Sequence, residues 1–154
     1  GGGSGQGLPV QERAEKIARA IERLNQDKGL KVDVAIEADL KFDGEKEDFD
    51  EVVGNIVDNA GKWATSHITV SAHKLPTDQR RPYMLFRVED DGPGVDEAEM
   101  EALFERGQRL DEHVPGTGLG LAIVRDIVEL YGGSAALEKA SLGGLAVILK
   151  LPAK

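Results

Sequence analysis

Hydrophobic residues recur along this 154-residue chain with two different periods, one typical of helices and the other typical of strands. Spacings of three and four residues predict a central helix over residues 49–64 and two outer helices over residues 8–28 and 119–131. Gly29 and the pair Gly132-Gly133 follow the outer helices and predict where they end. The apolar positions of the central helix are Phe49, Val52, Val53, Ile56, Val57 and Ala60.

Five segments alternate between apolar and polar residues, which predicts half-buried strands. A short extended piece around Leu40 and Phe42, a short helix over residues 96–103 and a long loop over residues 105–118 complete the chain. Helices and strands come in blocks, which favours an α+β sandwich, a mixed sheet covered by helices on one face. The strands are expected at residues 32–36, 67–74, 83–89, 134–138 and 145–151, the second and third forming a hairpin.

The composition fits a single domain with an aliphatic core, since only 5% of the residues are aromatic. The formal net charge of −9 argues against nucleic acid as a partner, because phosphate backbones are bound by surplus Lys and Arg. It leaves room for a nucleotide whose phosphates are neutralised by a metal ion and local cations. There is no cysteine for disulfide or thiol chemistry, and the sequence has no membrane-spanning run or signal peptide. Residues 1–7 are interpreted as an expression scar, which leaves residues 8–154 as the domain.

The central helix carries a polar strip beside its apolar stripe. Asn55, Asn59 and Lys62 fall at i, i+4 and i+7, so that two carboxamides and an ammonium project together. Asn is a poor helix former, which indicates that the two amides serve another purpose. Carboxamide oxygens can bind a hard cation such as Mg²⁺, which is commonly shared with phosphates. The residues alone leave open the alternative of two surface asparagines on an amphipathic helix.

Two glycine-containing segments are candidates for ligand contact. The turn DDGPG at residues 90–94 follows a strand, and Asp91 offers a hydrogen-bond acceptor there; an ordinary acidic turn is the alternative. The segment GTGLGL at residues 116–121 leads into a helix, where backbone N–H groups and the helix dipole favour phosphate. Its spacing fits neither the Walker pattern nor the dinucleotide fingerprint, and a flexible hinge is the alternative. The histidines His67, His73 and His113 lack helical ligand spacing and are interpreted as surface or structural residues.

The order and spacing of four motifs resemble the catalytic ATP-binding domain of two-component sensor histidine kinases, of the Bergerat or GHKL type. NIVDNAGKW resembles the N box, DDGPG the G1 box, ALFERGQR the F box and GTGLGLAIV the G2 box. The run FERGQR is most similar to the PhoQ-type branch of this family. The resemblance implies the Bergerat fold, a two-layer α/β sandwich in which a mixed sheet of five strands packs on three helices. It also implies that ATP is held between the N-box helix and a mobile lid.

The resemblance assigns roles to residues at the matching positions. The residues expected to contact Mg²⁺ are Asn55, Asn59 and Gln108. The residues expected to act in catalysis near the metal and the phosphates are Asn55, Lys62, Arg106 and Arg109.

The adenine amino group is expected to donate a hydrogen bond to Asp91 by the same resemblance. Trp63 stands where the family more often has Tyr, and Gly61 replaces a larger residue, which is expected to loosen the helix. The positions expected to bind the nucleotide are Asn59, Trp63, Asp91, Gly92, Gly94, Gly116, Thr117, Gly118, Leu119 and Gly120.

Asn55 separates this chain from the related ATPases, in which a Glu four residues before the Mg²⁺-binding Asn acts as the general base. An amide cannot take up a proton at neutral pH, so transfer to a supplied acceptor is expected rather than hydrolysis. The acceptor is expected to be a histidine on a separate dimerisation domain, because none of the chain's histidines lies in an H-box sequence.

The resemblance therefore implies a protein-histidine kinase domain that uses ATP and Mg²⁺ and signals to a response regulator. We expect this fragment to be monomeric and to be the cytoplasmic part of a sensor anchored in the inner membrane. The alternatives are a serine kinase of the anti-sigma-factor type and a nucleotide-binding regulatory module without transfer activity.

Overall fold

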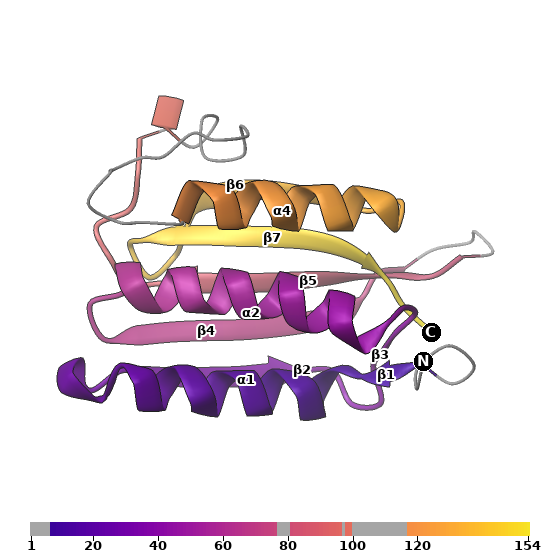
Figure 1. Cartoon of the computed structure of the whole chain (residues 1–154), viewed down its shortest axis with the longest axis horizontal. Helices are drawn as coiled ribbons and strands as arrows, with labels where there is room; N and C mark the ends of the chain where they lie inside the picture. The colour runs from indigo at the N-terminus through magenta and orange to yellow at the C-terminus, as the bar shows by residue number, and fades with distance from the viewer. Residues whose placement is uncertain (1–6, 77–80, 97, 100–116) are drawn as a thin grey trace.

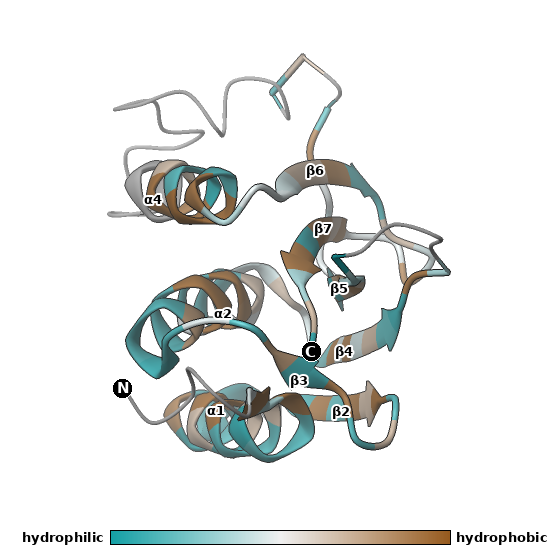
Figure 2. Ribbon diagram, turned by 90° about the vertical axis from the view of Figure 1, so that its right-hand side faces the viewer, coloured by the Kyte–Doolittle hydropathy of each residue, from teal (hydrophilic) through white to brown (hydrophobic). Residues whose placement is uncertain are grey.

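The computed structural model describes residues 7–76, 81–96, 98, 99 and 117–154, and for residues 117–120 it describes the backbone alone. The described chain forms two layers, with helices on one face of a twisted sheet (Figures 1 and 2). The helices of that layer are α1 (Val10–Leu24), α2 (Lys46–Trp63) and α4 (Thr117–Leu130). The short 3-10 helix η1 (Gln26–Lys28) follows α1. This arrangement confirms the predicted α+β sandwich.

The main sheet has five strands in the order β2-β4-β5-β7-β6. The first pair is parallel and the other pairs are antiparallel, so the sheet is mixed as predicted. β4 and β5 form the expected hairpin. The strands are β2 (Lys31–Ile36), β4 (His67–Lys74), β5 (Tyr83–Asp90), β6 (Ser134–Lys139) and β7 (Leu145–Pro152).

The first predicted helix is too long at both ends. Leu8 and Pro9 form strand β1 (Leu8–Pro9), which pairs with β3 (Lys41–Phe42) in a small antiparallel sheet. This pairing joins segments far apart in sequence, so local periodicity could not reveal it. At the other end, the Asn25 side chain donates to the carbonyl of Ile21 at 2.8 Å and closes α1. The 3-10 turn that follows ends at Gly29, whose φ of 62° is left-handed.

Part of the predicted loop is helical, because Thr117 and Gly118 already belong to α4. The rest of that loop, and most of the predicted helix at residues 96–103, lie outside the described residues.

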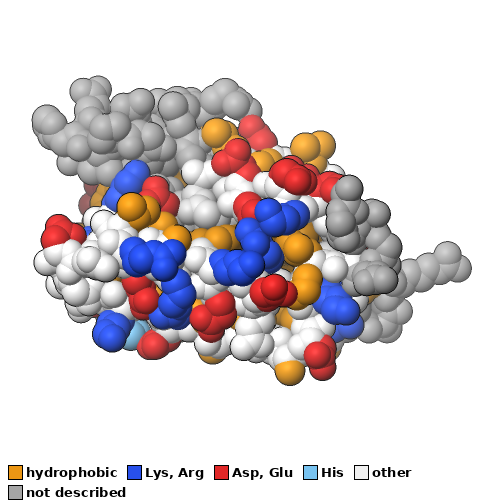
Figure 3. Space-filling view, turned by 60° about the horizontal axis from the view of Figure 1, so that its bottom comes forward, with side chains coloured by type: hydrophobic (Ala, Val, Ile, Leu, Met, Phe, Trp, Pro, Cys, Tyr) orange, Lys and Arg blue, Asp and Glu red, His pale blue; other side chains and the backbone are white. Residues whose placement is uncertain are grey.

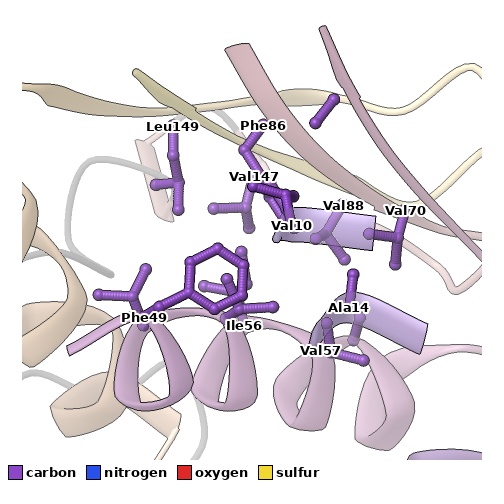
Figure 4. Packing of buried hydrophobic residues seen from close by; sticks show 14 of the residues in the cluster. Val10, Ala14, Phe49, Ile56, Val57, Val70, Phe86, Val88, Val147 and Leu149 are labelled. Carbon is purple, nitrogen blue, oxygen red and sulfur yellow. The ribbon is translucent and has the colours of Figure 1, made fainter. Parts of the chain in front are cut away.

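The core lies between α2 and the sheet (Figure 4). The apolar stripe of α2 is almost fully buried, as predicted, and packs beneath the inward residues of β4, β5 and β7. Burying one large aliphatic or aromatic side chain contributes roughly 1.5–3 kcal/mol, so this stripe fixes where α2 lies on the sheet. The largest fully buried side chains include Phe42, Phe49, Phe86, Ile56, Ile68, Met84 and Leu149.

Gly61 has a packing role that the sequence did not suggest. It is buried where α2 meets α1, and a Cβ added there would lie 3.0 Å from Cγ2 of Ile21 and 3.2 Å from Nδ2 of Asn25. The absent side chain lets the two helices approach closely.

Side chains of α1 also form hydrogen bonds with the backbone of β2, the strand at one edge of the sheet. Arg19 donates to the carbonyl of Val32 at 2.9 Å, and the amide of Val32 donates to Glu22 at 2.8 Å. Arg13 pairs with Asp50 of α2 at 2.8 Å. Lys and Arg side chains therefore alternate with Asp and Glu over this face rather than forming a single basic patch (Figure 3). None of the described helices is long and apolar enough to cross a membrane.

Candidate functional site

A narrow and mainly apolar pocket lies between α2, α4 and the inner face of the sheet. Its polar side chains include those of Asn59 and Asp90, and the half-buried Trp63 stands at the end of α2. The lining residues are Ile56, Asn59, Ala60, Trp63, Val88, Asp90, Leu121, Leu145 and Val147. A second, more polar cavity is lined by Pro93, Gly94, Val95, Asp96, Glu99, Lys139, Gly143 and Gly144. Gly143 and Gly144 line the second cavity, and the next residue, Leu145, lines the first.

Asn59 is the clearest sign of a ligand site in this pocket. Its side chain is 9% exposed, and its Nδ2 has no hydrogen-bond partner within the described residues. A buried polar group without a partner costs about 1–3 kcal/mol, so it is rare unless a ligand or water completes it. The carboxamide comes from the polar strip of α2, as predicted, and is available to a ligand in the pocket.

Asn55 and Lys62 flank Asn59 on the same helix but lie outside the pocket lining. The Asn55 side chain donates to the carbonyl of Glu51 at 2.6 Å and to its carboxylate at 2.9 Å. These bonds use the amide's donor group, so the carbonyl oxygen is the atom it can offer to a cation. Lys62 lies 3.3 Å from Asp58 and is 45% exposed, which places its charge in solvent at the helix end.

The Asp91 side chain has a structural role instead of the predicted contact with the adenine base. The amides of Thr65, Ser66 and His67 donate to its Oδ1 at 2.9, 3.0 and 3.0 Å. The Ser66 hydroxyl donates to its Oδ2 at 3.0 Å. Burial, the largest influence, raises the pKa of Asp91, but these hydrogen bonds together outweigh it and hold the pKa below its ordinary value. The Asp91 carboxylate binds the backbone amides of the segment that follows α2, and it does not line the pocket.

Asp90 is the carboxylate that faces the pocket, although the sequence pointed to its neighbour Asp91. It is 3% exposed, and its Oδ1 accepts from the amides of Gly92 at 2.8 Å and Leu145 at 3.4 Å. Burial raises the pKa of Asp90 despite these hydrogen bonds, and the neighbouring charge of Asp91 adds to the rise. The missed signal was the alternation of β5, in which Met84, Phe86 and Val88 point inward. Continuing this two-residue period once more, from Val88, puts Asp90 inside and Asp91 outside.

The glycines of the DDGPG turn allow close contact with α2. A Cβ on Gly92 would lie 2.2 Å from the carbonyl oxygen of Trp63, so a side chain cannot fit there. Gly94 has a φ of 75°, which favours glycine. The turn therefore packs directly on the C-terminal end of α2 and brings Asp90 next to Trp63 in the pocket.

The remaining predicted residues fall at the start of α4 or beyond the described chain. Thr117, Gly118, Leu119 and Gly120 form the first turn of α4, and Leu121 of the same helix lines the pocket. The positive end of the α4 dipole therefore lies near the pocket, as expected for a phosphate site. Arg106, Gln108, Arg109 and Gly116 lie outside the described residues.

The described part of the chain contains no group of three or more His, Cys, Asp and Glu that could hold a metal ion. His67 lies 2.8 Å from Asp33 across β2 and β4, consistent with the structural role expected for it. A metal in this site would depend on carboxamides and on oxygens of the ligand itself.

Comparison with known proteins supports the resemblance. The family model described as histidine kinase-, DNA gyrase B- and HSP90-like ATPase matches residues 44–154. The sensor protein PhoQ of Escherichia coli strain K12 is 38% identical over 136 residues, which are 88% of this chain and 27% of PhoQ. The chain therefore spans about a quarter of the length of that curated relative.

Solved structures of sensor kinases are also similar to the chain. The mycobacterial sensor histidine kinase MprB matches with a TM-score of 0.81 at 25% identity, covering 97% of both chains. The ATP binding domain of PrrB from Mycobacterium tuberculosis matches with a TM-score of 0.69 at 28% identity, covering 96% of both chains.

The cap formed by Asp91 leads to a prediction about stability. Asp91→Ala should lower the free energy of unfolding by about 1–2 kcal/mol at pH 7, since it removes an acceptor that is partly screened by solvent. A carboxyl with a lowered folded-state pKa stabilises the fold above its unfolded pKa of about 3.9, and this contribution is lost as the pH falls through the folded pKa. The free energies of unfolding of the unaltered protein and of Asp91→Ala, measured with urea, should therefore become equal in acid. The control Ser66→Ala removes one hydrogen bond and should cost less, and a constant difference across pH would contradict the account.

Proposed function

The chain belongs to the family of histidine kinase-, DNA gyrase B- and HSP90-like ATPases, and on that premise we propose that it catalyses phosphoryl transfer from Mg·ATP to a histidine. Residues 8–154 would form the catalytic domain, and the acceptor would lie on a separate dimerisation domain. The observation that carries this proposal is the pairing of two buried polar side chains in one apolar pocket. One is the amide of Asn59, whose Nδ2 has no partner in the part of the chain that the structure describes, and the other is the carboxylate of Asp90.

Asp90 and the first turn of α4 give the bound nucleotide an orientation. A buried carboxylate suits the amino group of adenine and repels phosphate, so the base would lie at Asp90. The phosphates would lie towards the N-terminus of α4, where the dipole and free amides favour negative charge. The half-buried ring of Trp63 would pack beside the nucleotide.

The residues present fit a magnesium ion shared with the phosphates. Each of the two asparagines can offer a carboxamide oxygen to the ion: Asn59 stands in the pocket lining, and the Asn55 bonds to Glu51 use only its Nδ2. These two would hold the ion together with Gln108, which is carried over from the resemblance. When bound, the ion would neutralise part of the phosphate charge, and Lys62, Arg106 and Arg109 would supply the remaining positive charge.

The polar strip of α2 favours transfer over hydrolysis. The position one turn before Asn59 is Asn55, whose amide cannot accept a proton from water. The Nδ2 of Asn55 already donates to Glu51, so these hydrogen bonds hold the side chain in place within α2. The site would therefore position ATP for attack by an acceptor that a partner brings.

The partners follow from this assignment. The first is the histidine-bearing domain of the same kinase, and the second is a response regulator that receives the phosphoryl group. The full-length sensor would be anchored in the membrane with this domain in the cytoplasm, where ATP is available. The names of the relatives, which are sensor histidine kinases, support this reading over a serine kinase or a regulatory module.

Transfer itself is tested with γ-labelled ATP and a separately made histidine-bearing domain. We expect label on the acceptor domain that is lost in acid and retained in base, which identifies phosphohistidine. Acid-stable label would mean a serine kinase, and nucleotide binding without label would mean a regulatory module; either result overturns the proposal.

The role of Asn59 predicts opposite effects on binding and folding. Asn59→Ala should weaken Mg·ATP binding by at least about tenfold, because it removes a metal contact. The free energy of unfolding without nucleotide should stay the same or rise, because the lost Nδ2 has no partner among the described residues and its burial is unfavourable. Calorimetry and urea unfolding measure the two effects. The control Glu47→Ala, on the exposed part of α2, should leave both unchanged, and undiminished affinity in Asn59→Ala would refute the metal role.

Base recognition by Asp90 predicts that ATP binds more tightly than ITP. ITP has an oxygen where ATP has the amino group, which sets two acceptors against each other. Hydrogen bonds to charged groups contribute roughly 1.5–3 kcal/mol, so ATP should bind at least about tenfold more tightly. Because burial raises the pKa of Asp90, ATP affinity should fall on acidification as that carboxylate becomes protonated.

Variants at the two aspartates separate their roles. Asp90→Asn should abolish the preference, because an amide can donate to the oxygen of ITP. Asp91→Asn should keep the preference, because Asp91 does not line the pocket. Equal dissociation constants of the unaltered protein for ATP and ITP would show that Asp90 does not read the base.

A further inference from the structure

We propose that Gly144, in the turn between β6 and β7, is a positioning residue for base recognition: its amide and its missing side chain hold Asp90 in the orientation that selects adenine. This inference rests on the proposed role of Asp90. It adds a specificity determinant from a segment that none of the four sequence motifs includes.

Asp90 is held by the backbone of two separate segments. The amide of Gly144 donates to the Asp90 carbonyl at 3.1 Å, and the amide of Leu145 donates to its Oδ1 at 3.4 Å. The amide of Gly92 donates to the same Oδ1 at 2.8 Å. With one carboxylate oxygen bound by two amides, Oδ2 is the oxygen left for a donor on the ligand.

Space, rather than backbone conformation, requires glycine at position 144. A Cβ there would lie 2.0 Å from Oδ1 of Asp90, 2.6 Å from its carbonyl oxygen and 2.8 Å from the amide nitrogen of Gly92. The φ of Gly144 lies outside the left-handed region, so alanine could otherwise adopt this backbone. Two of the three contacts are to backbone atoms. A rotation of the carboxylate alone would therefore not relieve them.

The turn itself is well anchored, so Asp90 is the part that would have to move. The amide of Ser141 donates to Glu89 at 3.1 Å, and its hydroxyl donates to the same oxygen at 3.3 Å. Ala140 and Gly144 are joined by a backbone hydrogen bond of 2.8 Å, which closes the turn. The Nε of Arg87 lies 3.2 Å from Oε2 of Glu89, and this ion pair helps to hold the Glu89 side chain in place. A side chain at position 144 would therefore push the carboxylate and the DDGPG turn away from their places.

The test compares ATP and ITP binding to Gly144→Ala by calorimetry. We expect about a tenfold loss of ATP affinity with little change for ITP, so that the preference for ATP falls towards one. Two controls lie in the same turn. Leu142→Ala alters an exposed side chain, and Gly143→Ala strains a φ of 108° without any atom within 4 Å of the new Cβ. The two controls should keep the preference for ATP over ITP. A loss of this preference in all three variants would show a general loss of turn structure and would contradict the specific role of Gly144.

The outcomes separate this inference from the proposed function. If the unaltered protein does not prefer ATP, the role of Asp90 fails and the role of Gly144 fails with it. A second outcome overturns only the inference about Gly144. In that outcome the unaltered protein prefers ATP to ITP, Asp90→Asn loses this preference, and a folded Gly144→Ala protein keeps it.

If Gly144→Ala does not fold, the amide resonances of the unaltered protein provide the test. ADP should shift the resonances of Gly144 and Leu145 together with that of Gly92, and IDP should shift them much less. An ADP response confined to Gly92 would overturn the proposal.

Discussion

The contact between the C-terminal end of α2 and the DDGPG turn fixes the geometry of the pocket. Gly92 lies against the carbonyl of Trp63, where a Cβ would be 2.2 Å from the oxygen. The Asp91 carboxylate binds the amides that follow the helix, and the amide of Asp91 donates back to His67 at 3.2 Å. Lys28 donates to the carbonyl of Ala64 at 2.8 Å, which places a cation at the negative end of the helix dipole. Because α2 carries Asn59 and the turn carries Asp90, this junction sets how the two side chains share one pocket.

The pocket contains two features that weaken the fold. The amide of Asn59 is buried, and no described residue hydrogen-bonds to its Nδ2, while Asp90 is a carboxylate whose pKa is raised by burial. Each such group costs on the order of 1–3 kcal/mol, against a net stability of about 5–15 kcal/mol for a typical domain. The rest of the chain follows ordinary rules, with an apolar stripe on α2 and alternating strands. Departures from those rules that meet in one pocket mark a functional site.

The sequence predicted the parts of this structure that depend on local period. The stripe of α2 and the alternation of the five strands are strong signals, and the sheet and its three helices appear where expected. Contacts between distant segments were not predictable in this way. Leu8 and Pro9 looked helical but pair with β3, and Gly61 looked like a weak point but allows α1 to approach. The choice between Asp90 and Asp91 was recoverable from the period of β5, whereas Gly144 becomes informative only once its distance from Asp90 is known.

Charge explains how an acidic protein can bind a polyphosphate in one direction. Asp90 is the one acidic side chain among the described residues that line the pocket, so its ionised form would repel anions from the part of the pocket beside it. Positive charge near the pocket comes from Lys62, which is exposed in the last turn of α2, and from the N-terminal end of the α4 dipole. Lys62 also lies beside Asp58, which reduces the charge it can offer on its own. On the proposed function, the net charge of −9 does not oppose ATP binding, but binding would depend on Mg²⁺ and on the arginines of the predicted lid. In the proposed arrangement the Asp90 carboxylate would orient the base, and the phosphates would lie near the start of α4, where an acceptor could reach them.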